Sequence, residues 1–334
     1  MSVNRKSTLL FFFALCGILF LCISLSITYG TKTVGFHSVM DALFASSASS
    51  FEAKVIQARI PRTIFGVLAG AGLGISGALM QSITRNPIAD PSILGVNTGA
   101  SLFVVCGIPF FHITSGNLYI LLAFLGASLT ALCVYGLASV GSSGPTPIKL
   151  ALAGAAASTA LQSLVNTVML PDTQVMDQFR FWQIGSIGAA SYADIRLMLP
   201  YILVGLVISI LLAPSLNTLA LGDEVAISLG LKVNLVRGIG AFSGVLLCAS
   251  ITALAGPIGF IGLMIPHFMR MLFGSDMRKL IPFSALGGSC LLLFADVVGR
   301  ILGRPGELES GIISALLGAP AFILIIRKAK VRAI

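Results

Sequence analysis

Residues 9–28 read LLFFFALCGILFLCISLSIT, an apolar run without a single charged side chain. The hydrocarbon core of a bilayer is about 30 Å thick, so a helix needs roughly 20 mostly apolar residues to cross it. The run is longer than the roughly 7–15-residue apolar region of a signal peptide, and no A-x-A-like cleavage site follows it. We therefore interpret residues 9–28 as a membrane-spanning helix.

About ten stretches of this kind occur along the chain, each long enough to cross or nearly cross a bilayer. Only 10% of the residues are charged, 56% are hydrophobic and the mean hydropathy is +1.00, whereas a soluble domain carries roughly 25% charged residues. The sequence predicts an all-α, polytopic membrane protein with these spans: 9–28, 63–83, 93–111, 118–140, 150–170, 198–216, 238–255, 258–273, 280–298 and 311–326.

The polar segments between the spans are short. The longest, residues 29–62 and 171–196, are predicted to be loops with room for a short surface helix. Neither can build a second core, so residues 1–334 are predicted to form a single transmembrane domain. The eighth span is the least regular, because Pro257 and Pro266 interrupt it.

The net charge of +9 is explained by basic residues at the ends of the spans, which follow the positive-inside rule. An even number of spans places both termini on one side, and the basic residues near both ends place that side in the cytoplasm. The six cysteines all lie in apolar stretches without a C-x-x-C pair, so neither a disulfide framework nor a metal site is predicted.

Small residues recur at the spacing used by packed membrane helices. Gly66, Gly70 and Gly74 form two overlapping G-x-x-x-G steps, which allow close contact between helix backbones. The fifth span contains ALAGAAASTA at residues 151–160 and is too small-sided for a lipid-facing helix. This span either packs deep in a bundle or lines a cavity with room for a substrate.

Nothing in the sequence indicates that this chain binds a nucleotide. The G-x-G-x-x-G match at residues 72–77 lies inside an apolar span, and no strand precedes it. No G-x-x-x-x-G-K-[ST] motif occurs. If ATP drives this protein, another chain binds it.

Three groups of residues could carry function. Residues 222–232 lie between spans six and seven, begin with Asp223 and Glu224, and place Val225, Ala226 and Leu229 on one predicted helical face. This segment is either an ordinary amphipathic connector or a helix that docks into a groove of a soluble partner.

The second group is Arg59, Arg62 and Arg300 at the predicted external face. These residues are either interfacial anchors or a cationic ring that orients an acidic partner. Asp296 lies four residues before Arg300, which favours a helix-end ion pair.

The third candidate is His267, a lone histidine in a span, which could transfer protons. Carriers driven by an ion gradient usually place ionisable groups near the midplane of the membrane. Since Asp296 is the only acid inside a predicted span, the sequence argues against such a carrier.

Several ordered motifs together resemble one protein family. They are RIPR at 59–62, GALMQ at 77–81, NPIADPSILG at 86–95, LGDEVAISLG at 221–230, AGPIGFIGLMIPH at 255–267 and LLGAPA at 316–321. From about residue 59 to its end, the chain resembles the FecCD-type permease subunits of bacterial ABC importers for ferric siderophores, haem and cobalamin.

This resemblance implies the type II importer fold, like that of the cobalamin importer, and a permease that works as a pair of identical or paralogous subunits in the bacterial inner membrane. It implies two cytoplasmic ATPases, which bind the ATP and Mg²⁺, an extracytoplasmic binding protein, and no cofactor or metal on this chain. It also implies site residues. Those for binding-protein docking are Arg59, Arg62 and Arg300; those for ATPase coupling, within about 222–233, are Gly222, Asp223, Glu224, Val225, Ala226, Leu229 and Gly230; those for the translocation path and gate are Ser142, Ser143, Ala155, Ser158, Thr159 and Gln162.

The function that we expect is import of a ferric siderophore by ATP-driven alternating access, with no enzymatic activity in this chain. Haem or cobalamin import by the same family is the first alternative, and a proton-coupled carrier that uses His267 is the second. The residues of the expected path do not identify the cargo.

Overall fold

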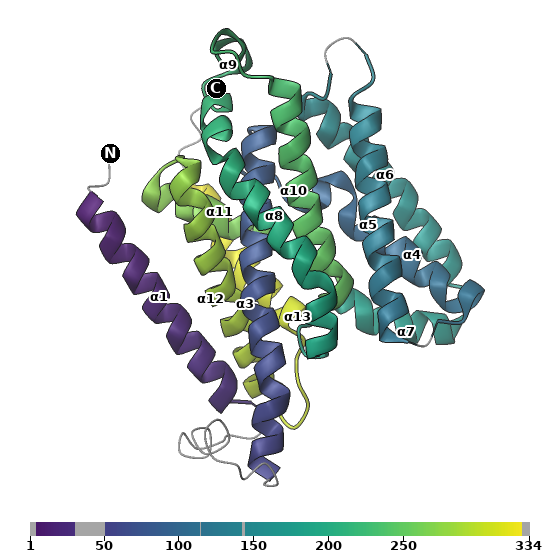
Figure 1. The fold of residues 1–334 in the computed structure, drawn as a ribbon. Helices are drawn as coiled ribbons and strands as arrows, with labels where there is room; N and C mark the ends of the chain where they lie inside the picture. The colour runs from purple at the N-terminus through teal and green to yellow at the C-terminus, as the bar shows by residue number, and fades with distance from the viewer. Residues whose placement is uncertain (1–4, 31–50, 114, 142–143, 329–334) are drawn as a thin grey trace.

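The computed structural model describes residues 5–30, 51–113, 115–141 and 144–328, and this part of the chain is helical without any strand. Figure 1 shows a bundle of long helices joined by short turns. The helices are α1 (Arg5–Thr28), α3 (Phe51–Thr84), η1 (Pro91–Leu94), α4 (Val96–Phe111), α5 (Gly116–Ala138), α6 (Pro147–Met169), α7 (Thr173–Ile184), α8 (Tyr192–Leu219), α9 (Asp223–Ser228), α10 (Val233–Ala255), α11 (Ile261–Phe273), α12 (Met277–Leu302) and α13 (Ser310–Lys328).

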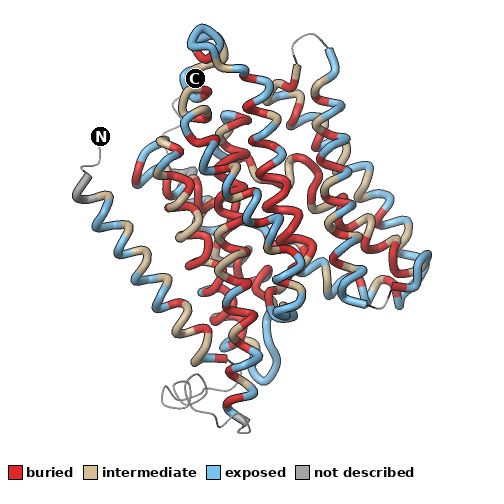
Figure 2. Tube along the Cα trace, in the orientation of Figure 1, coloured by how far each residue is buried: buried red, intermediate tan, exposed pale blue. Residues whose placement is uncertain are grey.

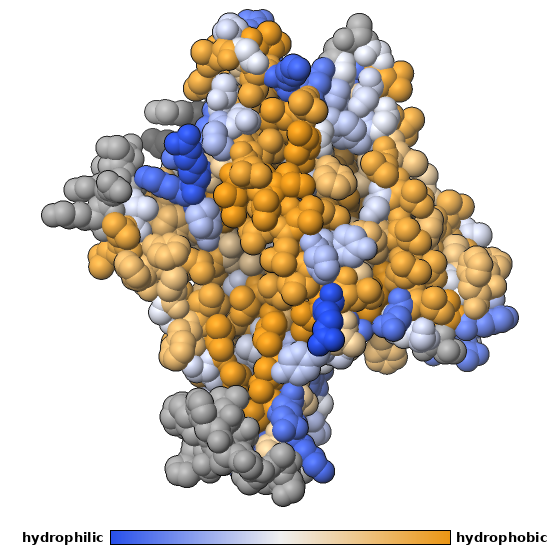
Figure 3. Space-filling view, viewed as in Figure 1, coloured by the Kyte–Doolittle hydropathy of each residue, from blue (hydrophilic) through white to orange (hydrophobic). Residues whose placement is uncertain are grey.

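All ten predicted spans fall on helices. Seven of the described helices are long and apolar enough to cross a membrane, and the other three spans correspond to the shorter apolar helices at Val96–Phe111, Ile261–Phe273 and Ser310–Ile323. Figure 3 shows that hydrophobic residues cover most of the visible side of the bundle, while hydrophilic residues gather mainly toward its two ends. The predicted fold class, an all-α polytopic membrane protein, is confirmed.

The second span is longer than predicted. Residues 51–62 belong to α3, a helix of 34 residues with Pro61 inside it, and not to a loop. At 1.5 Å per residue this helix is about 51 Å long, well beyond the roughly 30 Å of the bilayer core. Residues 171–196 do contain a short surface helix, α7, whose first turn is capped by the Asp172 carboxylate.

Helix α3 lies at the centre of the packing. It contacts α8, α10, α11 and α12, and buried residues run along it and along α10 in Figure 2. Helices α4, α5 and α6 pack on one another, and α10 joins them to the rest of the bundle through its contact with α5. Helix α9 lies at one end of the molecule (Figure 1). Helix α12 runs away from this end, and α13 returns toward it.

The contact between α3 and α12 is made by the backbones themselves. A Cβ atom built at Gly70 would lie 2.4 Å from the carbonyl oxygen of Gly288, and one at Gly74 would lie 2.2 Å from that of Ser284. Such distances leave no room for any side chain, so the predicted small-residue spacing serves helix packing here. The Ser289 hydroxyl adds a hydrogen bond of 2.7 Å to the Val67 carbonyl across the same contact.

We predict that Gly74→Ala lowers the melting temperature of the purified protein, because α3 and α12 must separate to admit the methyl group. Overpacking of this kind costs about 1–3 kcal/mol of stability. The matched control is Gly136→Ala in α5, where a Cβ meets nothing within 4 Å. Helix propensity then favours alanine, and the control should melt at or above the wild-type temperature. Equal melting of the two variants would contradict the packing argument.

Candidate functional site

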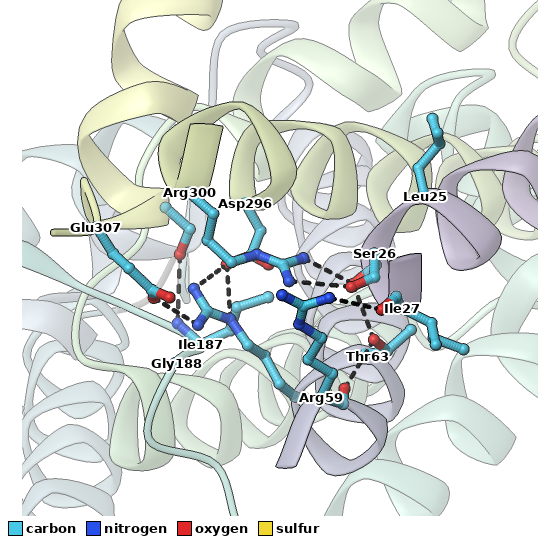
Figure 4. Close-up of polar contacts among 12 residues, drawn as sticks. Leu25, Ser26, Ile27, Arg59, Thr63, Ile187, Gly188, Asp296, Arg300 and Glu307 are labelled. Carbon is cyan, nitrogen blue, oxygen red and sulfur yellow. Dashed lines mark hydrogen bonds and ion pairs between the residues drawn. The ribbon is translucent and has the colours of Figure 1, made fainter. Parts of the chain in front are cut away.

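A cluster of charged residues joins α1, α3 and α12 (Figure 4), close to the C-terminal end of α1, which lies away from α9 in Figure 1. Arg62 donates to Asp296 Oδ1 from Nε (3.1 Å) and from Nη2 (2.7 Å), and its Nη1 donates to Glu307 Oε2 (2.6 Å). The Arg300 guanidinium lies 2.9 Å from Asp296 Oδ2. One aspartate therefore neutralises arginines from two helices, and the predicted pairing of Asp296 with Arg300 is confirmed.

The same arginines tie α1 to the bundle. Arg300 donates to the carbonyl (2.9 Å) and the hydroxyl (3.0 Å) of Ser26. Arg59 donates to the carbonyls of Ile27 (2.9 Å) and Thr28 (3.0 Å). These carbonyls belong to the last turn of a helix and have no partner within it. The guanidinium groups therefore act as C-terminal caps for α1.

The predicted cationic ring is thus held inside the chain. Arg59, Arg62 and Arg300 are only 7%, 8% and 1% exposed, and each is bound to groups of the same chain. The exposed charges beside them are Glu307 and Arg304, and the latter donates to the Gly30 carbonyl. Docking of a partner by the three buried arginines stays a prediction. The variant Arg62→Glu cannot test docking alone. Its carboxylate would face that of Asp296, and the repulsion would destabilise the fold as well.

The segment that begins at Gly222 forms α9, a helix of six residues. The expectation that Val225, Ala226 and Leu229 share one outward face is wrong for Ala226, which is fully buried. Sequence reasoning missed Ile227, which is 61% exposed, beside Val225 and Leu229 at 45% and 64%. In a helix shorter than two turns, packing decides which residues face out. The apolar surface of α9 is therefore Val225, Ile227 and Leu229, with Leu221 just before the helix.

Asp223 connects α9 to the bundle. Its Oδ1 atom accepts hydrogen bonds from Arg85, at the end of α3, and from Arg237 of α10 at 3.0 Å. Arg85 also donates to the Leu219 carbonyl at 2.7 Å. Sequence reasoning placed Asp223 in the segment without finding these partners. Asp223 therefore links α9 to the end of α3 and to α10 through charged groups.

Helix α6 presents a polar stripe to the outside of this chain. Thr159, Ser163 and Thr167 are exposed, and each hydroxyl donates to the carbonyl four residues earlier, at 2.8–3.0 Å. Gln162 donates to Asn166 Oδ1 at 3.2 Å. Ala155 is exposed on the same helix, whereas Ser158 is half-buried and accepts from the Thr98 hydroxyl at 3.4 Å.

The turn at residues 86–95 positions α6. The Asp90 carboxylate accepts from Ser92 N at 2.9 Å and caps η1, and the Ile93 carbonyl of η1 meets α6 at Gly154. A Cβ at Gly154 would lie 1.6 Å from that oxygen, so only glycine fits there. The predicted gate residues Ser142 and Ser143 lie outside the described residues.

His267 lies on α11 and contacts the Phe322 ring edge-on, with ring centroids 6.2 Å apart. Neither of its ring nitrogens has a hydrogen-bond partner in the described part of the chain. Within that part, no group of three or more histidine, cysteine, aspartate or glutamate residues could hold a metal ion.

The model of the FecCD transport family matches residues 17–328. The ferric enterobactin transport system permease protein FepD of Escherichia coli (strain K12) is 41% identical over 311 residues, which are 93% of each chain. The Fe(3+)-citrate import system permease protein YfmD of Bacillus subtilis (strain 168) is 36% identical over 98% of this chain and 97% of its own. A solved metal-chelate type ABC transporter in an inward-facing conformation superposes with a TM-score of 0.83, at 29% identity, over 95% of this chain and 98% of that one.

We predict that Asp296→Ala strongly destabilises the protein, because it leaves Arg300 buried without a counter-ion and Arg62 with Glu307 alone. Breaking a buried ion pair by removing one partner costs about 3–5 kcal/mol. Glu307→Gln is the control, since Glu307 is partly exposed and such pairs contribute about 0–1 kcal/mol. Thermal unfolding in a mild detergent measures both. A melting temperature of Asp296→Ala equal to that of the control would contradict the structural role of the cluster.

Proposed function

Because this chain belongs to the FecCD transport family, we propose that it is the membrane-spanning permease subunit of an ATP-driven importer of ferric siderophores. The observation that carries the proposal is α9, which turns apolar side chains outward and is tied by Asp223 to two helices of the bundle. The full-length similarity to permeases for ferric enterobactin and ferric citrate supports the class of cargo.

The proposed partner at α9 is a soluble ATPase, which also binds the ATP and Mg²⁺. Val225, Ile227 and Leu229 are exposed beyond the spanning helices, where water would otherwise meet them. Exposed apolar groups that lie together mark interaction sites. An amphipathic helix of this size fits into a groove of a partner. Gly222, Glu224 and Gly230 complete the proposed coupling segment, the two glycines at positive φ values of 117° and 82°.

Because the proposed ATPase is cytoplasmic, its docking at α9 implies how the permease is oriented in a bacterial inner membrane. The α9 end and both termini face the cytoplasm, in agreement with the positive-inside rule. The charged cluster then faces outward, where an extracytoplasmic binding protein docks. Arg304 and Glu307 form the outer layer of the proposed docking surface, and the buried Arg59, Arg62 and Arg300 lie beneath it.

The polar stripe of α6 supports a second permease subunit, either another copy of this chain or a paralogue. Hydroxyl and amide groups facing lipid would be unfavourable, so this face is suited to a water-filled path between two subunits. We propose that the cargo passes between the paired α6 helices along Ala155, Ser158, Thr159 and Gln162, and that Ser142 and Ser143 lie at the gate.

Haem and cobalamin remain the alternative cargoes of the same machinery. A proton-coupled carrier has less support, because among the described residues His267 has no acidic partner. Uptake of labelled ferric siderophore after the proton gradient is collapsed with ATP preserved separates the two mechanisms. Continued uptake favours the ATP-driven importer, and loss of uptake favours the carrier. A panel of catecholate, hydroxamate, citrate and haem complexes then identifies the cargo.

We predict that Ile227→Asp releases the ATPase from the tagged permease when it is isolated in mild detergent. A carboxylate at a position that is 61% exposed disturbs the groove contact but not the bundle. ATP hydrolysis in the eluate measures the loss. The matched control is Phe181→Asp on α7, which is 76% exposed at the other end of the molecule and should retain full ATPase activity. Retention of the ATPase by both variants would argue against α9 as its docking site.

We predict a different outcome for Asp223→Asn. The apolar surface of α9 is unchanged, so the ATPase should still be isolated with the permease. The amide bears no charge to pair with Arg85 and Arg237, and losing such contacts weakens the link by about 1–3 kcal/mol. Uptake should fall while ATP hydrolysis persists. Asp177→Asn, an exposed acid on α7, is the control. Unchanged uptake in Asp223→Asn would show that Asp223 does not transmit the movement.

A further inference from the structure

A groove of about 600 Å³ opens on the side of the bundle between α1, α3, α8 and α12. Figure 1 shows α12 and α3 between α1 and α8 on the side that faces the viewer, and Figure 3 shows this side to be largely hydrophobic. The volume falls within the roughly 300–1,000 Å³ of small-molecule pockets. The groove is lined by Phe12, Ile75, Leu206, Ile210, Ala213, Pro214, Met277, Arg278, Ile281, Pro282, Ala285 and Leu286.

A single charged residue stands among these apolar groups. Arg278 is exposed in the first turn of α12, two residues after the capping residue Asp276, and Lys279 follows it. No ion pair of Arg278 with an acid is found in the described part of the chain. The guanidinium group therefore lies at one end of an apolar groove with its donors available for an anion.

The depth of the groove matches one leaflet of a bilayer. On α12 it extends from Met277 to Leu286 and on α8 from Leu206 to Pro214, which is about 14 Å and about 12 Å of helix, respectively. One leaflet contributes roughly 15 Å of hydrocarbon, half of the bilayer core. Asn217 closes the α9 end of the groove by bonding Asp276 Oδ1 (2.6 Å) and Met277 N (2.7 Å).

Two prolines leave unpaired acceptors along the groove. Pro214 and Pro282 lie inside their helices and have no N–H, so the carbonyls of Ile210 and Arg278, four residues earlier, lose their helical donor. Both of those residues line the groove. The carbonyl and the guanidinium of Arg278 together offer an acceptor and donors at the level where a lipid head group begins.

We propose that this groove is a binding site for an anionic phospholipid, with its phosphate on Arg278 and an acyl chain along α8 and α12. The charge of Arg278 complements the phosphate, and the apolar lining complements the chain. A void at this surface would deprive its walls of contacts, whereas a lipid tail restores them. The site joins α1 to the bundle from the α9 side, as the arginine cluster does from the opposite side.

Native mass spectrometry of the full-length permease with added phosphatidylglycerol tests this proposal. The wild type should retain phosphatidylglycerol at detergent concentrations that strip other lipids, and should prefer it to phosphatidylcholine. Arg278→Gln should weaken this binding about tenfold, as expected when a hydrogen bond to a charged group is lost. Ala285→Phe should lower the affinity for both lipids by filling the groove.

Two control variants separate the groove from the general lipid surface. Arg196→Gln removes an exposed charge at the start of α8, and Leu203→Phe enlarges an exposed apolar residue of α8 outside the groove. Both should bind phosphatidylglycerol as the wild type does, and glycerol phosphate without acyl chains should not compete. Equal binding by all variants, a preference for phosphatidylcholine, or a second copy of the chain bound at this face would overturn the proposal.

Discussion

The close approach of α3 to α12 is the constraint on which the other contacts depend. In lipid, apolar side chains gain nothing by leaving the acyl chains, so helices associate through close packing and polar contacts. Gly70 and Gly74 on α3 and Gly288 on α12 bring the two backbones together. The same two helices carry Arg62 and Asp296, whose hydrogen bond of 2.7 Å requires that separation. The packing of the small residues and the pairing of the buried charges therefore both require the same short distance between α3 and α12.

Each end of α3 uses the same device, an aspartate shared by two arginines. Asp296 is shared by Arg62 and Arg300 at one end, and Asp223 is shared by Arg85 and Arg237 at the other. Arg62 lies inside α3 and Arg85 directly follows its last residue, so the two are about 35 Å apart along the helix axis. Ion pairs therefore connect α3 to its neighbours near both faces of the membrane.

The sequence was sufficient for the fold class and for placing each predicted span on a helix, because hydropathy over about 20 residues reports membrane helices directly. It failed at the start of α3, where the polar segment 29–62 was predicted to be a loop and residues 51–62 are helical. Their partners cannot be recognised locally, since Asp296 lies 234 residues from Arg62 along the chain. It also misassigned Ala226, because a six-residue helix is too short for periodicity to reveal its buried side.

The hydroxyl groups of α6 have a consequence for which iron chelates the proposed importer accepts. Thr159, Ser163 and Thr167 already donate to their own helix, so this surface offers a passing molecule few strong contacts. A surface that binds no molecule tightly also discriminates little between one molecule and another. Under the proposed function, discrimination among iron chelates would then rest with the binding protein, and a cell could acquire a new iron source by replacing that component while keeping the permease unaltered.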